Sequence, residues 1–187
     1  MFPAILITMA IANIVDIDDF IGRYALSTNT YSDEKFDDFV TQEQYDLLID
    51  MFGAALYNVY DADSADVNWV ALRDGETYTD LAGYTQNWQG LKYLMKPFIF
   101  SRWLEADHLK AVQSGVVKPQ FENATAATEY QRKDFAYKRW NQFVIRWYEC
   151  YNYLSTQNSN DSTKYDEFWI HWKSKFKDGI AVKSNIT

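Results

Sequence analysis

Two long stretches of the chain carry apolar side chains at steps of three and four residues, and this spacing predicts two long helices with one buried face each. The first stretch is 90–112, with a stripe that includes Leu91, Leu94, Met95 and Phe98. Pro97 lies inside it, and because proline has no amide N–H we expect a kink there or two helices meeting at an angle. The second stretch is 129–154, with a stripe of Ala136, Trp140, Phe143, Val144, Trp147, Tyr151 and Leu154.

Shorter elements precede these helices. Residues 1–15 are uncharged and apolar, and their β-branched side chains favour an extended arm. The arm either inserts into this domain or reaches a neighbouring molecule. Residues 16–26 predict a short helix with acidic residues in its first turn, where they suit the helix dipole. Residues 35–60 predict one helix or a broken pair, in which Thr41 would cap the second helix and Gln44 would complete a capping box.

The other segments predict turns, linkers and one short terminal helix. Residues 75–90 contain three glycines and predict a loop or a small hairpin. Residues 114–127 and 155–164 are predicted linkers, the first with Gly115 as a helix stop. A last helix at 165–176 places aromatic side chains on one side, which we interpret as a docking peg made of Phe168, Trp169 and Trp172.

Together these elements predict a mostly α fold with one helical domain, built on the long central helix and the long helix that follows it. Its length of 187 residues suits one domain with a sizeable core and additional arms. We expect an N-terminal arm at 1–15, the helical domain at 16–155, and a linker, docking helix and tail at 156–187.

The composition narrows the class of protein. Apolar residues make up 48% of the chain and aromatic residues 18%, a density typical of interfaces as well as cores. The formal net charge of −8 argues against a sequence-reading nucleic-acid binder, which would carry a basic face. Charged residues interrupt the long apolar stretches, so we expect no membrane span. A secretory signal would need a basic leading region, and no basic residue precedes Arg23.

The charge is unevenly distributed along the chain. Residues 1–89 contain three basic and sixteen acidic residues, a balance of −13, whereas residues 90–187 have a balance of +5. Such asymmetry indicates complementary faces, either within one molecule or between neighbouring copies. For the second case, we predict that acidic residues of 35–60 face basic residues of 129–154 on the next copy, while apolar contacts of the arm and the peg supply the affinity. The candidate interface residues are Phe2, Ile5, Ile7, Asp37, Asp46, Arg132, Lys133, Arg139, Phe168, Trp169 and Trp172.

Candidate chemistry is sparse. Glu105 and His108 form the Glu-x-x-His unit that binds iron in helical bundles, but such a site needs two of these units and two further glutamates. A local salt bridge is the simpler interpretation, and a metal-dependent hydrolase is kept as an alternative function. Cys150 is the only cysteine and lies in a helix among tyrosines, where a thiol is usually inert. No phosphate loop, dinucleotide fingerprint or nucleophile motif is present. We therefore expect no enzyme activity, cofactor or metal.

A set of short segments carries a resemblance to a known family. They are the run Phe52-Gly53-Ala54-Ala55-Leu56-Tyr57, Gly75 with Thr77-Tyr78, Gly90-Leu91-Lys92, the turn Ser114-Gly115-Val116-Val117-Lys118, and a long helix ending near Tyr153-Leu154. In this order they resemble the head–tail connector (adaptor or ring) proteins of tailed bacteriophages, particularly phages of Bacteroidetes. The resemblance covers roughly residues 16–155. The family usually has leucine at the position of Phe52, and residues 1–15 have no counterpart in it.

The resemblance implies a structural virion protein without catalysis. Such a helical subunit assembles in the host cytoplasm as a ring, a dodecamer, located at the portal–tail junction of the virion. Its partners would be other copies of itself, the portal protein, and tail or further ring proteins. Genomic DNA would pass through the channel without sequence-specific binding, and an acidic ring would repel rather than grip the phosphate backbone. A tail-completion or other tail structural protein is the alternative within virion proteins.

Overall fold

The computed structural model describes residues 13–24, 33–62, 65–106, 110–112, 115–117, 129–166 and 182–183. Two short 3₁₀ turns, Ile17–Asp19 and Gly22–Tyr24, precede helix α1 (Asp33–Ala62) and helix α2 (Val67–Asp74). A first hairpin, β1 (Glu76–Thr79) and β2 (Thr85–Trp88), leads to helix α3 (Leu91–Ala106). A second hairpin, β3 (Lys110–Val112) and β4 (Gly115–Val117), precedes helix α4 (Glu129–Asn160). The prediction of a mostly α fold with a small hairpin between 75 and 90 is confirmed.

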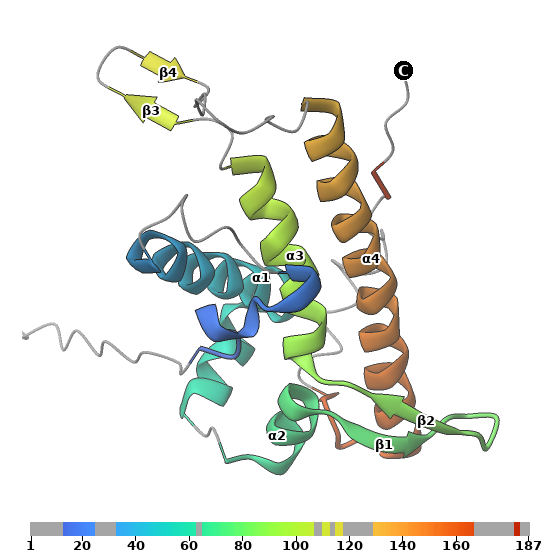
Figure 1. Cartoon of the computed structure of the whole chain (residues 1–187). Coiled ribbons are helices and arrows are strands. Elements are labelled where there is room, and N and C mark those ends of the chain that lie inside the picture. The colour runs from blue at the N-terminus through green and yellow to red at the C-terminus, as the bar shows by residue number, and fades with distance from the viewer. Residues whose placement is uncertain are drawn as a thin grey trace, which may run out of the picture.

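The core lies on both sides of α3 (Figure 1). On one side α3 packs along α4, where the rings of Phe98 and Phe143 have centroids 4.9 Å apart. On the other side α1 places Phe36 and Phe39 edge-on against Trp103, each at a centroid distance of 4.9 Å. Each large apolar side chain removed from water contributes about 1.5–3 kcal/mol. The central helix is therefore the element on which the rest of the domain is assembled.

Helix α3 continues through Pro97 as one element. The alternative of two separate helices is therefore wrong. Proline cannot donate to the carbonyl four residues earlier, which is that of Tyr93. The guanidinium of Arg146, on α4, donates a hydrogen bond from Nη1 to this carbonyl oxygen. A side chain from the neighbouring helix thus replaces the bond that the proline removes.

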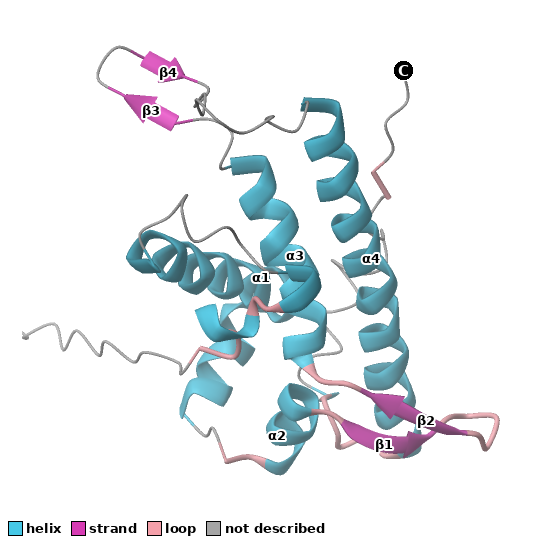
Figure 2. Ribbon diagram, viewed as in Figure 1, coloured by secondary structure: helices cyan, strands magenta, loops and turns pink. Residues whose placement is uncertain are grey.

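The predicted helix at 90–112 is too long. Helix α3 ends at Ala106, and residues 110–112 form strand β3, which pairs antiparallel with β4. The predicted linker at 114–127, with Gly115 as a helix stop, is accordingly wrong for 115–117. Valine at 112, 116 and 117 favours extended backbone because its branched side chain is restricted in a helix. Figure 2 shows this second hairpin beyond the C-terminal end of α3, while β1 and β2 lie at its N-terminal end.

Helix α4 is six residues longer than predicted, because it runs to Asn160 through a segment that we expected to be a linker. Its polar end is held by the first hairpin. Gln157 Nε2 donates to Glu76 Oε1 at 3.0 Å, and Asn160 Nδ2 donates to the carbonyl of Thr79 at 3.3 Å. Thr156 is also buried. These tertiary hydrogen bonds outweigh the low helix propensity of the segment.

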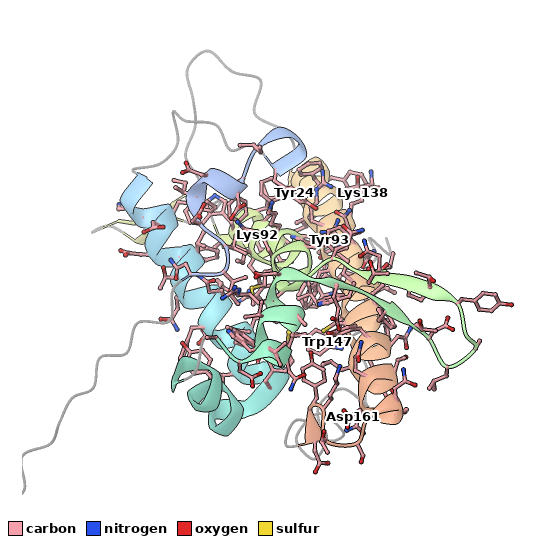
Figure 3. All side chains as sticks on the ribbon, turned by 90° about the horizontal axis from the view of Figure 1, so that it is seen from below. Tyr24, Lys92, Tyr93, Lys138, Trp147 and Asp161 are labelled. Carbon is pink, nitrogen blue, oxygen red and sulfur yellow. The ribbon has the colours of Figure 1, made fainter. Side chains whose placement is uncertain are left out.

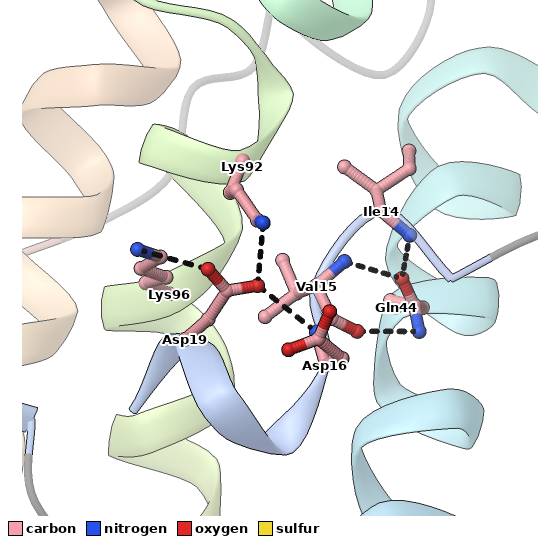
Figure 4. A network of polar contacts seen from close by, with 7 residues as sticks. All are labelled: Ile14, Val15, Asp16, Asp19, Gln44, Lys92 and Lys96. Atoms are coloured by element: carbon pink, nitrogen blue, oxygen red, sulfur yellow. Dashed lines mark hydrogen bonds and ion pairs between the residues drawn. The ribbon is translucent and has the colours of Figure 1, made fainter. Parts of the chain in front are cut away.

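The break in α1 lies at Gly53, which has φ 78° and ψ 156°. This agrees with the prediction of a broken pair, but the predicted cap at Thr41 is wrong, because Thr41 lies inside the helix. Gln44 does not form a capping box either. Its side-chain oxygen accepts the amide N–H groups of Ile14 at 2.9 Å and Val15 at 3.3 Å, and its nitrogen donates to the carbonyl of Val15 (Figure 4). A buried glutamine therefore binds the N-terminal segment to α1.

The N-terminal segment belongs to the domain from residue 13 onward. Ile14 and Val15 are buried in the core, so the arm predicted at 1–15 ends earlier, and residues 1–12 lie outside the described residues. The short helix predicted at 16–26 is wrong: the segment forms two 3₁₀ turns. The carboxylate of Asp19 accepts the amide N–H of Asp16 and also contacts two lysines of α3, which holds this turn against the helix (Figure 4).

Candidate functional site

The structure places the described residues with catalytic or metal-binding potential apart from one another. Glu105 forms an ion pair with Lys183 at 2.6 Å, and His108 lies outside the described residues. Within the described parts of the chain, no three His, Cys, Asp or Glu side chains are grouped to hold a metal ion. Cys150 is fully buried, and burial raises the pKa of its thiol well above the ordinary value. A thiol in this environment remains protonated and unreactive.

The predicted acidic surface exists on α1. Asp37 and Asp46 are both exposed there, and Asp46 accepts a hydrogen bond from Gln42 at 2.9 Å. Glu43 pairs with Arg102 of α3 at 3.2 Å. Asp37 has no ion-pair partner among the residues that the structure describes. The outer face of α1 therefore retains most of its negative charge.

The predicted basic surface of α4 is smaller than expected. Lys133 is exposed, and Lys138 is exposed and pairs with Asp134 at 2.7 Å, but the side chain of Arg132 is outside the described residues. Arg139 is only partly exposed, and only 4% of Arg146 is exposed.

Aromatic rings explain why these two arginines turn inward. The guanidinium of Arg139 lies 5.0 Å from the centroid of the Tyr24 ring and 4.8 Å from that of Phe135. The guanidinium of Arg146 lies over the ring of Tyr93. Cation–π contacts and buried aliphatic stems favour such positions. Both arginines consequently belong to the packing of the domain, not to an outer basic face.

The two charged helices lie on opposite flanks of α3. Figures 1 and 3 both show α1 on one side of the central helix and α4 on the other. The acidic face of α1 is therefore not neutralised by α4 of the same molecule. Three ion pairs nevertheless join the acidic first half of the chain to the basic second half within one molecule: Asp19 with Lys92 and Lys96, and Glu43 with Arg102. Contact between copies stays a prediction.

Several apolar side chains missed by the sequence analysis are exposed. On α4, Ile145 is 61% exposed and Tyr148 is 46% exposed. At the tip of the first hairpin, Leu81 and Tyr84 are 67% and 69% exposed. Ile145 and Tyr148 are three residues apart and lie off the buried stripe of α4. This spacing could have predicted from the sequence that they are exposed. They give the outer face of α4 a small apolar surface beside its lysines.

A pocket was also missed. It has a volume of about 570 Å³ and lies where the N-terminal segment, the end of α2, the start of α3 and the middle of α4 meet. Its lining includes the cationic side chains of Arg73, Lys92, Lys96 and Arg146. These residues are far apart in the sequence, and no local motif connects them.

Asp19 adjoins the pocket and neutralises part of this charge. Its carboxylate lies 2.8 Å from Lys92 Nζ and 3.4 Å from Lys96 Nζ. Burial raises the pKa of Asp19, but the hydrogen bond from Lys92 and the charges of both lysines lower it by more. The pKa therefore lies below its ordinary value of 3.8.

The remaining predicted interface residues lie outside the described residues. These are Phe2, Ile5 and Ile7 of the arm, and Phe168, Trp169 and Trp172 of the docking peg. Their role stays a prediction. The predicted tail beginning at 178 is described only at 182–183, where the backbone of Lys183 exchanges two hydrogen bonds with the side chain of Asn141.

A search for membrane-spanning helices and three comparisons with known proteins complete the description. Among the described residues, no helix combines the length and apolar character needed to cross a bilayer. No family model, no curated protein and no solved structure matches the chain.

Proposed function

We propose that the chain is a structural subunit of a ring that joins the portal of a tailed bacteriophage to its tail and extends the DNA channel. The proposal rests on the resemblance to the connector family, and two of the resembling segments, at Tyr78 and at Tyr153, meet in the structure. Tyr153 stacks on Trp88 at a centroid distance of 5.6 Å and contacts the edge of Tyr78 at 5.2 Å. Its hydroxyl donates to Glu76 Oε1 at 2.7 Å. The first hairpin and the C-terminal half of α4, which are far apart in the sequence, therefore pack against each other.

The surface chemistry supports a structural role. The described residues provide no metal group and no reactive cysteine, and they place opposite surface properties on two flanks of the domain. An acidic α1 on one flank and an α4 with lysines and apolar side chains on the other suit a head-to-tail contact between identical copies. Such heterologous contacts form closed rings when the rotation between neighbours permits it.

Apolar contacts would supply most of the affinity in this ring. Exposed ion pairs contribute only about 0–1 kcal/mol each, so Asp37 and Asp46 would determine register and encounter rate more than strength. Ile145 and Tyr148 would each bury a large apolar surface against the neighbouring copy. The net charge of −8 suits a channel through which DNA passes without being held.

The proposal is tested by mixing the purified chain with the portal of the same phage and examining the products by negative-stain electron microscopy and sedimentation. We expect rings with cyclic symmetry attached to the portal. The double variant Ile145→Ser/Tyr148→Ser should reduce ring formation at physiological salt more than Asp37→Lys/Asp46→Lys does. Circular dichroism controls for folding of both variants. A wild-type chain that stays monomeric with its portal at all concentrations would contradict the proposal.

A further inference from the structure

The pocket between the N-terminal segment, α2, α3 and α4 has an unbalanced charge. Four cationic side chains line it, at Arg73, Lys92, Lys96 and Arg146. Two carboxylates accompany them, because Asp19 contacts both lysines and Asp74 binds Arg73 at 2.7 Å. Glu149 also acts electrostatically on Arg146, so the local charge is positive by about one, in a chain whose formal net charge is −8.

Arg146 is the unusual member of this set. Only 4% of it is exposed. Glu149 acts on it electrostatically, but no described carboxylate accepts a hydrogen bond from it. Both of its hydrogen bonds come from Nη1, one to the carbonyl of Tyr93 and one to the hydroxyl of Tyr24 at 3.4 Å. Nε is buried and has no hydrogen-bond partner in the described part of the chain. A buried guanidinium with only neutral acceptors is costly, and an anion in the adjoining pocket would offset that cost.

The surroundings also suit a ligand with an anionic group. Tyr24 and Tyr93 line the same pocket, so aromatic surface lies beside the cationic groups. Figure 3 shows Tyr24, Lys92 and Tyr93 near one another where these elements meet, with Lys138 on the outer side of α4. The volume of about 570 Å³ lies within the usual range for small-molecule sites.

We propose that this pocket binds the phosphate group of a small soluble molecule, with Lys92, Lys96 and Arg146 as the contacting cations. A phosphate monoester carries a charge of about −1.5 to −2 near neutral pH, which is opposite in sign to the local excess. Guanidinium and ammonium groups are the usual partners of phosphate oxygens. Duplex DNA is disfavoured, because the polyanion would also meet the negative charge of the rest of the chain. This inference does not depend on ring assembly.

The test is calorimetric titration of the full chain at constant ionic strength with two probes, inorganic phosphate and adenosine monophosphate. We expect saturable binding with one site per chain. Lys92→Gln should weaken binding about tenfold, because it removes one charge-assisted contact. The matched control Lys138→Gln removes an equally charged, exposed lysine of α4 outside the pocket and should leave the affinity unchanged. Tighter binding of adenosine monophosphate would identify an organic phosphate, and binding of inorganic phosphate alone would identify the free ion.

Several outcomes would overturn the proposal. They are the absence of saturable binding by the wild-type chain, equal weakening by the two lysine variants, or tighter binding of a DNA duplex than of either probe. Circular dichroism establishes that each variant is folded. If Lys92→Gln is not folded, Lys96→Gln takes its place, with the same expected loss and the same control.

Discussion

Replacing Gly90 by alanine should destabilise the domain far more than replacing Gly83. Gly90 has φ +86°, and a Cβ atom there would lie 2.4 Å from the carbonyl oxygen of Arg73 and 2.8 Å from the carbonyl carbon of Asp74. Gly75, at the end of α2, is equally close to the backbone before α3, since a Cβ there would lie 2.4 Å from the carbonyl oxygen of Trp88. The end of α2 and the start of α3 therefore approach each other backbone to backbone, without room for a side chain.

The expected loss of unfolding free energy in Gly90→Ala follows from a comparison with Gly83→Ala. Gly83 has nearly the same backbone angle, φ +87°, but a Cβ there would meet nothing within 4 Å. An alanine at Gly83 therefore lowers the unfolding free energy only through its left-handed backbone conformation, by about 1–2 kcal/mol. At Gly90 the cost of the left-handed conformation is the same, but the new Cβ would also clash with backbone atoms, which cannot rotate away. Overpacking of this kind costs about 1–3 kcal/mol more. We expect losses of about 1–2 kcal/mol for Gly83→Ala and about 2–5 kcal/mol for Gly90→Ala.

Urea unfolding followed by circular dichroism at 222 nm measures both losses, with the helical signal as the observable for α3 and α4. The midpoint for Gly90→Ala should lie well below that for Gly83→Ala, with similar slopes for the two variants. If both variants lost the same free energy, the close approach between the two backbone segments would not exist in solution.

Three further variants test other contacts. Gln44→Leu should cost about 2–4 kcal/mol in urea unfolding because it leaves two buried amide groups unpaired, whereas the exposed Gln42→Leu should cost under about 0.5 kcal/mol; equal costs would contradict the role of Gln44. Arg146→Met should be less destabilising, by about 1 kcal/mol, in the Pro97→Ala background, since alanine restores the amide N–H that the guanidinium replaces; an additive double-mutant cycle would refute this coupling. The lowered pKa of Asp19 contributes stability that is present above its ordinary value of 3.8 and is lost as pH falls through the lower folded value, so Asp19→Asn should flatten the loss of stability between about pH 5 and about pH 3. An unchanged acid limb in that variant would show that the carboxylate is not stabilised by its lysines.

The buried stripes of the two long helices could be predicted because helical periodicity is a local property of the sequence. The same periodicity also held information about polar residues. Gln44 stands four residues after Val40 and three before Leu47, which places it on the buried face of α1. Arg146 stands three residues after Phe143 and four before Cys150, on the buried face of α4. Both residues could therefore have been placed on buried helix faces from their spacing alone.

Other features could not be found from local pattern. The end of α4 at Asn160 depends on hydrogen bonds to Glu76 and Thr79, which lie about eighty residues earlier in the chain. The pocket between the N-terminal segment, α2, α3 and α4 combines side chains from four separate segments, and its charge balance depends on the contacts of Asp19 with the lysines of α3. Contacts of this kind are set by tertiary packing, so propensity and spacing alone do not reveal them.

The most direct test of the ring proposal is a cryo-electron microscopy reconstruction of tailed-phage virions produced from a genome that encodes the chain. We expect a ring of identical subunits between portal and tail, with density into which α1, α3 and α4 fit, the flank formed by α1 of each copy facing α4 of the next. Density for the chain at another position, such as the distal tail, or its absence from the virion, would contradict the proposal.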